Sequence, residues 1–478
     1  MATARRTHIA PTTGLQILIP RSFLFVAILS VVVAVSAWAQ EPEPPESNHT
    51  LGFEAKVHYR DSDEARFGVR FPFSPSMLPV GQSQGFLETV EPGTHFEAST
   101  VTLWYKGTWD EAWGGGVATK IKVDLIDRYD RNPTSTDDEW DVDEAWLRWG
   151  PETEPGNLPD YGFTAYLKLG KFPKFERQDD RHLESYGLVT TAFNRMEDIG
   201  IEIGSDLGRF FYTKVSYTEG NPLFLRDPNA LAGDNGIPEL LQPNPNPELK
   251  TGIAIPYDAD VAIDDVGFEE PEIGVALGAR MGDDAGFWNL DVMAFLYSRD
   301  LADTREFEGS FYGGDLDLLL GPLNAFPFAV RNRTKEEIGL NVWLYAGGLS
   351  IFGQYVDQDL GGLSRDGFEI EVAYDWELPW AGTLFGRQLF PFVAPAIRYS
   401  ELNPDFPLVD PSLPPITPSP AFNWDWQKLD LGIRLGILTG LDLTVEYAEN
   451  EFVRAGQKES ADELMATLRF DWDWSPGQ

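Results

Sequence analysis

The sequence predicts an all-β fold, a transmembrane antiparallel β-barrel of about sixteen strands, with eighteen as the upper expectation. Three observations predict it: an export signal at the start, no later apolar run of helical-span length, and short alternating segments whose connections are short and long in turn. Lipid leaves no water to satisfy an open sheet edge, so a membrane chain without spanning helices must close its strands into a barrel.

Residues 1–39 have the composition of an export signal. Three arginines precede an apolar run from Phe23 to Trp38, and this stretch contains no acid. The run of about sixteen residues is short for a membrane span of roughly twenty, and Ala37-Trp38-Ala39 matches a cleavage site. We therefore expect a signal peptide over 1–39, a periplasmic lead-in over 40–50 and an outer-membrane β-barrel over 51–478.

The charge balance narrows the function classes. The chain has 37 Lys plus Arg against 76 Asp plus Glu; removing the three signal arginines leaves 34 against 76, a net charge of −42. Such acidity argues against a nucleic-acid partner, while an aromatic content of 13% argues against disorder. The absence of cysteine excludes disulfides and thiolate metal sites. An exported chain of this kind fits the Gram-negative outer membrane, with outer-membrane lipid around it.

Alternating polar and apolar residues indicate the individual strands. Phe53 to Arg60 and Ala65 to Phe71 are interpreted as one bulged first crossing. The remaining crossings are expected at 95–108, 117–126, 139–149, 163–172, 199–204, 210–217, 273–281, 287–297, 337–345, 349–356, 368–376, 391–400, 424–435, 441–447 and 464–474.

The connections support the same topology, because periplasmic turns of such barrels are short and extracellular loops are long. Short connections are predicted at 110–116, 205–208, 282–286, 346–348 and 436–440, and long ones at 72–94, 173–198, 218–272, 298–336 and 401–423. The connections at 150–162 and 377–390 fit neither length well. Either is long enough to contain extra structure.

Strand parity assigns the two faces of the wall. In the last strand Leu464, Leu468 and Trp472 share the parity expected to face lipid, while Thr467 and Arg469 take the inward one. The same rule predicts that one part of the lumen is lined with cations, namely Lys106, Lys120, Lys122, Arg148 and Lys168, with Arg66 and Arg70 as further candidates. A later strand has acids on its inward parity, namely Glu369, Glu371 and Asp375.

The loop after Phe172 is the stretch most directly linked to function. It holds Lys174, Arg177, Arg181, His182 and Arg195 among four acids. If this loop folds into the barrel it narrows the lumen, and its charges then act on solutes at close range. An ordinary surface loop is the alternative. Whether its cations are paired with the neighbouring acids is left open at this point.

This region resembles the phosphate-selective porin O/P family. The resemblance rests on Leu169-Gly-Lys-Phe-Pro173, Asn194-Arg-Met-Glu-Asp-Ile-Gly200, Asp206-Leu-Gly208 and Tyr217-Thr-Glu-Gly-Asn221. It implies a sixteen-stranded diffusion channel, often a homotrimer, with a basic constriction for anions. By position it implies that Lys171, Lys174, Arg177, Arg181 and Arg195 form the pore constriction.

Motifs for catalysis are weak, so no enzyme, catalytic residue, metal or cofactor is expected. Gly81-Gln-Ser-Gln-Gly85 matches G-x-S-x-G but lies in a predicted loop without the strand-to-helix turn that the nucleophile needs. We expect a porin for passive diffusion of small solutes or ions, in particular anions such as phosphate. The alternatives are a channel for carbohydrate or another specific substrate, and a non-conducting barrel that acts as an adhesion scaffold or hydrolase.

Overall fold

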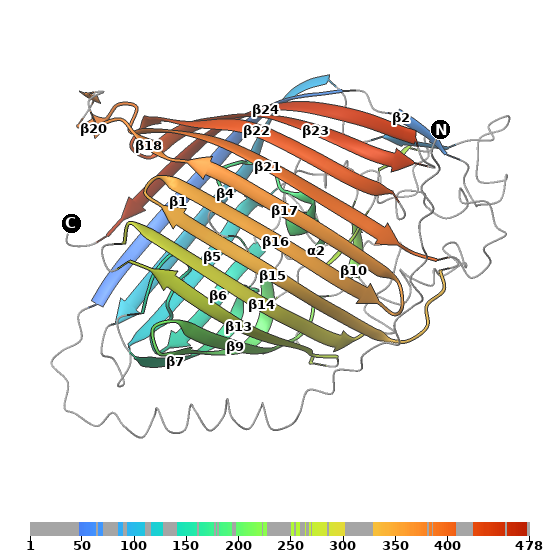
Figure 1. Cartoon of the computed structure of the whole chain (residues 1–478). Coiled ribbons are helices and arrows are strands. Elements are labelled where there is room, and N and C mark those ends of the chain that lie inside the picture. The colour runs from blue at the N-terminus through green and yellow to red at the C-terminus, as the bar shows by residue number, and fades with distance from the viewer. Residues whose placement is uncertain are drawn as a thin grey trace.

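A computed structural model describes most of the chain, and Figure 1 shows its course. The described residues are 47–63, 66–69, 85–88, 93–109, 116–127, 141–159, 162–175, 178, 181–193, 197–221, 223–226, 250–252, 255–258, 263, 267–268, 270–283, 286–301, 328–379, 382–384, 386–407, 424–454 and 457–475. None of the described helical residues forms a segment long and apolar enough to cross a membrane.

Sixteen strands of the described chain form one closed antiparallel barrel. Neighbours along the chain pair with each other, and β1 closes the barrel by pairing with both β4 and β24. The barrel strands are β1 (Ser47–Ser62), β4 (Gly93–Trp109), β5 (Val117–Asp127), β6 (Asp141–Trp149), β7 (Phe163–Pro173), β8 (Glu197–Leu207), β9 (Phe211–Thr218), β13 (Glu272–Gly282), β14 (Trp288–Asp300), β15 (Thr334–Ala346), β16 (Leu349–Leu360), β17 (Ser364–Tyr374), β21 (Phe392–Asp405), β22 (Asp425–Leu438), β23 (Leu441–Arg454) and β24 (Gln457–Trp474). The seventeenth strand of this sheet, β18 (Trp376–Glu377), continues the crossing of β17 along β21.

The predicted strands therefore match the sixteen crossings, with one correction. The prediction that Ala65–Phe71 continues the first crossing is wrong, because β2 (Arg66–Val69) pairs with β3 (Gly85–Glu88) outside the barrel sheet. β1 already has 16 residues, enough for a tilted strand to cross alone. Its first four residues lie within the stretch expected to lead into the barrel.

Short strands outside the barrel occur in the longer connections. β3 also pairs in parallel with β11 (Lys250–Gly252), and β10 (Leu223–Arg226) pairs with β12 (Ile255–Asp258). The connection at 377–390 contains the small hairpin of β19 (Thr383–Leu384) and β20 (Arg387–Gln388), the extra structure that its length allowed. At the loop end, the connections after β16 and β23 are short, so the alternation of lengths is incomplete there.

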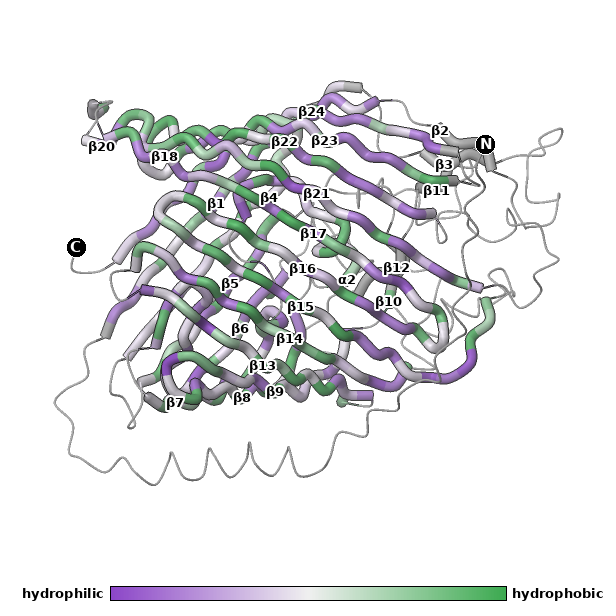
Figure 2. Tube along the Cα trace, in the orientation of Figure 1, coloured by the Kyte–Doolittle hydropathy of each residue, from purple (hydrophilic) through white to green (hydrophobic). Residues whose placement is uncertain are grey.

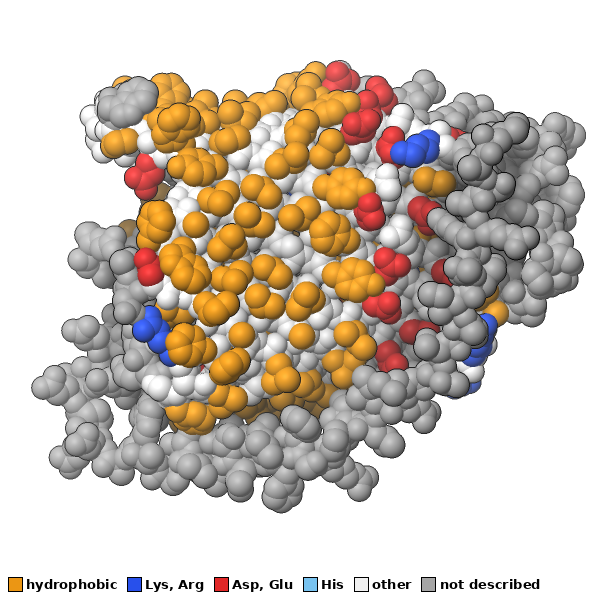
Figure 3. All heavy atoms as spheres, viewed as in Figure 1, with side chains coloured by type: hydrophobic (Ala, Val, Ile, Leu, Met, Phe, Trp, Pro, Cys, Tyr) orange, Lys and Arg blue, Asp and Glu red, His pale blue; other side chains and the backbone are white. Residues whose placement is uncertain are grey.

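The outward face of the wall is apolar, as strand parity predicts. In β24, Leu464, Leu468 and Trp472 are exposed, whereas Met465 and Thr467 are buried. Figure 2 shows hydrophobic and hydrophilic residues alternating along each strand. In Figure 3 the apolar side chains form a broad band over the barrel strands, with acidic side chains along its edge nearest the long loops. This band is the surface that a bilayer covers.

Candidate functional site: the lumen and its inward loop

The described residues of the connection between β7 and β8 lie inside the barrel. Its described residues from Lys174 to Phe193 are almost all buried, and it contains the six-residue helix α2 (Leu188–Phe193). The helix contacts β16, β17, β21 and β22, and Figure 1 shows it between the front and back walls. Near its start the loop packs against β14, where Phe175 stacks on Tyr297 with ring centroids 4.9 Å apart. The loop leaves one side of the barrel and binds the other.

Acids of the far wall hold the backbone of this inward loop. The Glu371 carboxylate accepts hydrogen bonds from the His182 backbone N–H at 3.0 Å and from Gln178 at 3.4 Å. Glu446 of β23 accepts from the backbone N–H groups of Glu184 and Ser185 at 3.0 and 3.2 Å. Buried N–H groups need such acceptors, because leaving one unpaired costs about 1–3 kcal/mol. The inward acids of β17 and β23 thus fasten the loop.

Both ends of helix α2 are capped by charges of the sign that its dipole favours. Glu369 accepts from the backbone N–H groups of Val189 and Thr190 at 3.2 and 3.4 Å, and from the Thr190 hydroxyl at 3.1 Å. At the other end, Arg365 donates to the Ala192 carbonyl oxygen at 3.0 Å. Negative charge at the N-terminus and positive charge at the C-terminus stabilise a helix. Two residues of β17 therefore position this short helix.

A buried arginine links the loop to two further strands. Arg398 of β21 donates to Asp430 of β22 at 2.8 Å and to the Ser185 hydroxyl at 2.7 Å. Ser185 in turn donates to Glu446. Charges buried in this way are stable only when each has a partner. The network ties the middle of the loop to β21, β22 and β23.

A salt bridge joins the loop to the first strand. The Lys56 Nζ lies 3.0 Å from a carboxylate oxygen of Glu184, and both side chains are mostly buried. Burial alone raises the pKa of the Glu184 carboxyl, but the Lys56 ammonium more than offsets this effect and lowers the pKa to about 2. The carboxylate is therefore charged at neutral pH.

The predicted constriction cations have different surroundings. Lys174 is buried, with its Nζ 2.7 Å from Glu272 and 4.7 Å from the Tyr297 ring centroid. The Arg181 guanidinium lies 3.7 Å from the ring centroid of Tyr186, and it takes part in no ion pair with a described residue. Its Nη1 has no hydrogen-bond partner. Arg177 and Arg195 lie outside the described residues.

Lys171 is buried at the end of β7, although it shares its parity with the exposed Leu169. Gly170 between them has a φ of 125°, which L side chains rarely adopt, so simple alternation does not extend across it. A Cβ on Gly170 would lie 2.1 Å from the Ala145 carbonyl oxygen, so this position also has no room for a side chain.

The wall cations lie on the inward face, as parity predicts, and acids neutralise most of them. Lys120 lies 2.5 Å from Glu144, and Lys122 lies 2.5 Å from Asp143. Lys106 is the most open, with 47% of its side chain exposed and an acid, Glu154, 4.0 Å away. Arg148 and Lys168 both contact Glu152. The side chain of Arg66 and all of Arg70 lie outside the described residues.

Three carboxylates could in principle hold a metal, those of Asp143, Glu144 and Glu197, which lie within 4.8 Å of one another. Lys120 and Lys122 already contact two of them, so cationic side chains occupy the place that an ion would take. The G-x-S-x-G match lies outside the described residues except for Gly85, which begins β3. Neither feature forms a catalytic arrangement among the described residues.

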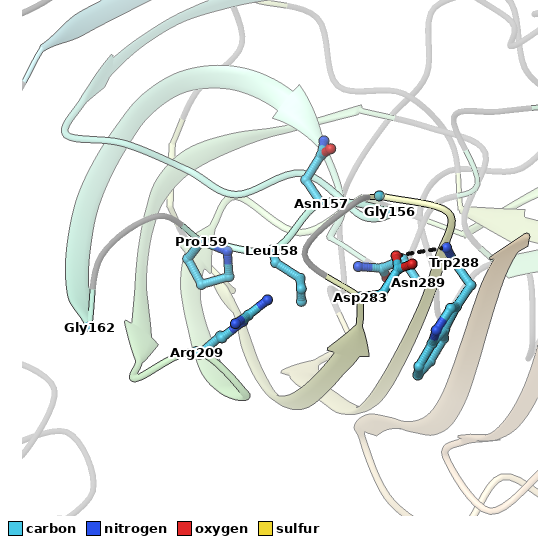
Figure 4. Close-up of a pocket in the computed structure, with 10 residues that line it drawn as sticks. Gly156, Asn157, Leu158, Pro159, Gly162, Arg209, Asp283, Trp288 and Asn289 are labelled. Atoms are coloured by element: carbon cyan, nitrogen blue, oxygen red, sulfur yellow. Dashed lines mark hydrogen bonds between the residues drawn. The ribbon is translucent and has the colours of Figure 1, made fainter. Parts of the chain in front are cut away.

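The connection between β6 and β7 also folds inward, from the end with the short turns. The Thr153 hydroxyl donates to Asp206 at 2.8 Å, and its carbonyl oxygen accepts from Arg280 of β13 at 2.9 Å. Figure 4 shows its residues facing the turns after β8 and β13 across a cavity of about 450 Å³. The cavity is lined by Gly156, Asn157, Leu158, Pro159, Gly162, Arg209, Asp283, Gly286, Trp288 and Asn289. We name the described residues of this connection, 150–159 and 162, the inward turn.

Sequence reasoning missed the anchors of the loop and the role of this turn. Glu446, Asp430 and Arg398 do occupy the inward parity of their strands, and that signal was available. Glu152 lies in a connection whose unusual length was noted, but its partners come from β6, β7 and β9. Only the closed barrel brings these strands together.

The closed wall, the outward apolar band and the loop inside the lumen together define an outer-membrane β-barrel of porin architecture. This is the architecture that outer-membrane β-barrels share.

Solved structures of similar fold include an outer-membrane channel and an anion-selective porin. The chain resembles OprB of Pseudomonas putida at high pH with a TM-score of 0.47 and 10% identity, over 90% of this chain and 94% of that one. The outer-membrane channel DcaP of Acinetobacter baumannii matches with a TM-score of 0.48 and 10% identity, over 91% of this chain and 100% of that one. An anion-selective porin from Comamonas acidovorans matches with a TM-score of 0.46 and 12% identity, over 89% of this chain and 100% of that one. No protein-family model and no curated protein matches the chain. These likenesses concern the fold.

Proposed function

We propose that the chain is a passive outer-membrane porin whose inward loop narrows the lumen and favours small anions such as phosphate. The main support is Arg181. It lies on the inward loop, half-buried against Tyr186, and no described acid neutralises it within ion-pair distance. A guanidinium in this position presents donors that match the geometry of phosphate and carboxylate oxygens.

The acids of the lumen are largely occupied, which also favours anions. Glu369, Glu371 and Glu446 accept hydrogen bonds from the loop, and Glu272 lies against Lys174 and Lys335. A solute inside the barrel is therefore exposed to less negative charge than the net charge of the chain suggests. Charges on the distant outer loops are screened beyond a Debye length of about 8 Å. Local charge at the loop then outweighs the acidity of the whole chain.

A bilayer measurement tests this proposal. Refolded protein in a planar bilayer under a potassium chloride gradient should conduct in discrete steps, with a reversal potential of the sign for anion preference and with block by added phosphate. Arg181→Gln should move the reversal potential toward cation preference, since it removes a charge where the lumen is narrowed. Lys458→Gln is the matched control, because Lys458 carries the same charge on an exposed side chain paired with Glu451.

The outcomes separate the alternatives. If Arg181→Gln and Lys458→Gln both leave the reversal potential unchanged, anion selection at the inward loop is wrong. If the native protein prefers cations, the channel function still holds, but acidic residues set its selectivity. Folded protein without conductance would favour a non-conducting barrel, either an adhesion scaffold or a hydrolase. The resemblance to the porin O/P family also supports a homotrimer, which sedimentation of the detergent-solubilised protein tests directly.

A further inference from the structure

Three cations from three different strands converge on one carboxylate of the inward turn. Arg148 of β6 donates to Glu152 at 2.9 Å, and Lys168 of β7 and Lys214 of β9 lie 3.0 and 3.1 Å from its two oxygens. Glu152 is the only one of the four that belongs to a connection rather than to a strand. The cations are therefore fixed by the barrel wall, while their shared anion is supplied by the turn.

The cations outnumber the acids at this place. Lys168 also lies 3.3 Å from Glu202 of β8, whose other described contact is the Tyr166 hydroxyl at 2.7 Å. Three cations against Glu152 and Glu202 leave one positive charge, and without Glu152 two would remain. In addition, the Arg148 Nε is buried without a hydrogen-bond partner. A site with surplus positive charge and an unpaired N–H donor can bind an anion.

Water reaches the cluster. Between 11% and 16% of the Arg148, Glu152, Lys168 and Lys214 side chains is exposed, in contrast to the ion pair of Lys335 and Glu272, which is fully buried. Burial alone raises the pKa of the Glu152 carboxyl, but the three cations lower it well below its usual range. Glu152 is therefore an anion at a place that is partly exposed to water.

We propose that Arg148, Lys168 and Lys214 form a binding site for the carboxylate group of a small solute, which Glu152 occupies while the channel is empty. The inference rests on the proposed channel function and adds a second site at the periplasmic side of the lumen, opposite to the inward loop. An entering carboxylate exchanges with Glu152, so the cations stay paired throughout. The inward turn stays attached during this exchange through Thr153, which contacts Asp206 and Arg280.

Glu152→Gln tests the site, because it keeps the shape of the side chain and removes the competing charge. Binding of propionate to detergent-folded protein is measured by isothermal titration calorimetry, which does not require a conducting channel. The variant should bind propionate at least about tenfold more tightly than the native protein, since it no longer has to displace a tethered anion. In bilayers, propionate should block the variant at correspondingly lower concentration.

Glu154→Gln is the matched control. Glu154 lies two residues away on the same turn, is 66% exposed and is 4.0 Å from Lys106, so its removal changes the net charge equally without opening the site. Its propionate affinity should stay within about twofold of the native value. Adding Lys214→Met to Glu152→Gln should abolish the gain. If Glu152→Gln yields too little folded protein, Glu152→Asp reaches the cations less well and should show a smaller gain.

Equal effects of Glu152→Gln and Glu154→Gln would overturn the proposal, because the general field and not the site would then explain binding. Unchanged affinity in Glu152→Gln would overturn it as well, as would a gain that survives Lys214→Met. Binding that follows the predicted order in protein without conductance would support the site and contradict the channel. Conductance with anion preference, in protein whose variants do not follow the predicted order of propionate affinity, would support the channel and contradict the site.

Discussion

The Lys56 ammonium of β1 lies 3.0 Å from the Glu184 carboxylate of the inward loop, a salt bridge between residues 128 positions apart. The inward loop begins at the end of β7. This salt bridge to β1 and the hydrogen bonds to β17 and β23 hold the loop across the lumen. Its strength depends on Glu184 remaining ionised.

We predict that the contribution of this salt bridge to stability is lost in acid. The pKa of Glu184 falls from an ordinary value of 4.5 to about 2 in the folded protein, so its charge favours folding above about pH 4.5 and this contribution disappears as the pH falls toward 2. Glu184→Gln should lower the free energy of unfolding by about 3 kcal/mol at pH 7 and by almost nothing near pH 2. Urea unfolding of both proteins across this range measures the difference, and a constant difference would contradict the assignment.

We predict that a side chain at position 367 displaces helix α2. A Cβ there would lie 2.9 Å from both Phe193 and Val189, which pack over Gly367 of β17. Gly367→Leu should therefore push the helix from the wall, lower stability by about 1–3 kcal/mol and increase single-channel conductance. Gly353→Ala on the neighbouring strand is the control, because the nearest atom to its Cβ lies 3.9 Å away. Similar conductance in both variants would show that the helix does not narrow the path.

We predict that charge on the outward band is tolerated according to depth. Leu468 lies within the outward apolar run of β24. Leu51 of β1 lies level with the end of β24, because it pairs with Trp474, the last residue of that strand. Both are about equally exposed, at 42% and 43%. Leu468→Arg should destabilise the folded barrel in lipid by about 2–4 kcal/mol and Leu51→Arg by about 0–1 kcal/mol. If refolding titrations in vesicles give equal destabilisation for Leu468→Arg and Leu51→Arg, then Leu468 does not lie deeper in the bilayer than Leu51.

The strands could be predicted from the sequence because each follows a local rule. The alternation of exposure in β24 is complete from Leu464 to Trp472, and a membrane-facing wall leaves no alternative face for those side chains. The predicted first crossing extends too far, because Arg66–Val69 alternates like a strand and is one, but pairs with β3 outside the barrel sheet. Local alternation identifies a strand without identifying its partner.

The state of the charges could not be predicted, because partners come from distant parts of the chain. Glu369 and Thr190 are 179 residues apart, and Ser185 and Glu446 are 261 apart. From sequence, Glu369, Glu371 and Asp375 are expected on the inward face. Asp375 follows β17 and is 51% exposed, whereas Glu369 and Glu371 of β17 lie inward and buried. That they accept hydrogen bonds from loop N–H groups follows only from the path of the loop, which no local pattern specifies.

The inward turn and the inward loop enter the lumen from opposite ends of the barrel. The loop brings Arg181 beside a ring from the extracellular side, and the turn brings Glu152 into a group of three cations from the periplasmic side. The two halves of the proposed permeation path therefore arrange their fixed charges differently. We therefore predict that the proposed channel passes unequal currents at equal and opposite voltages.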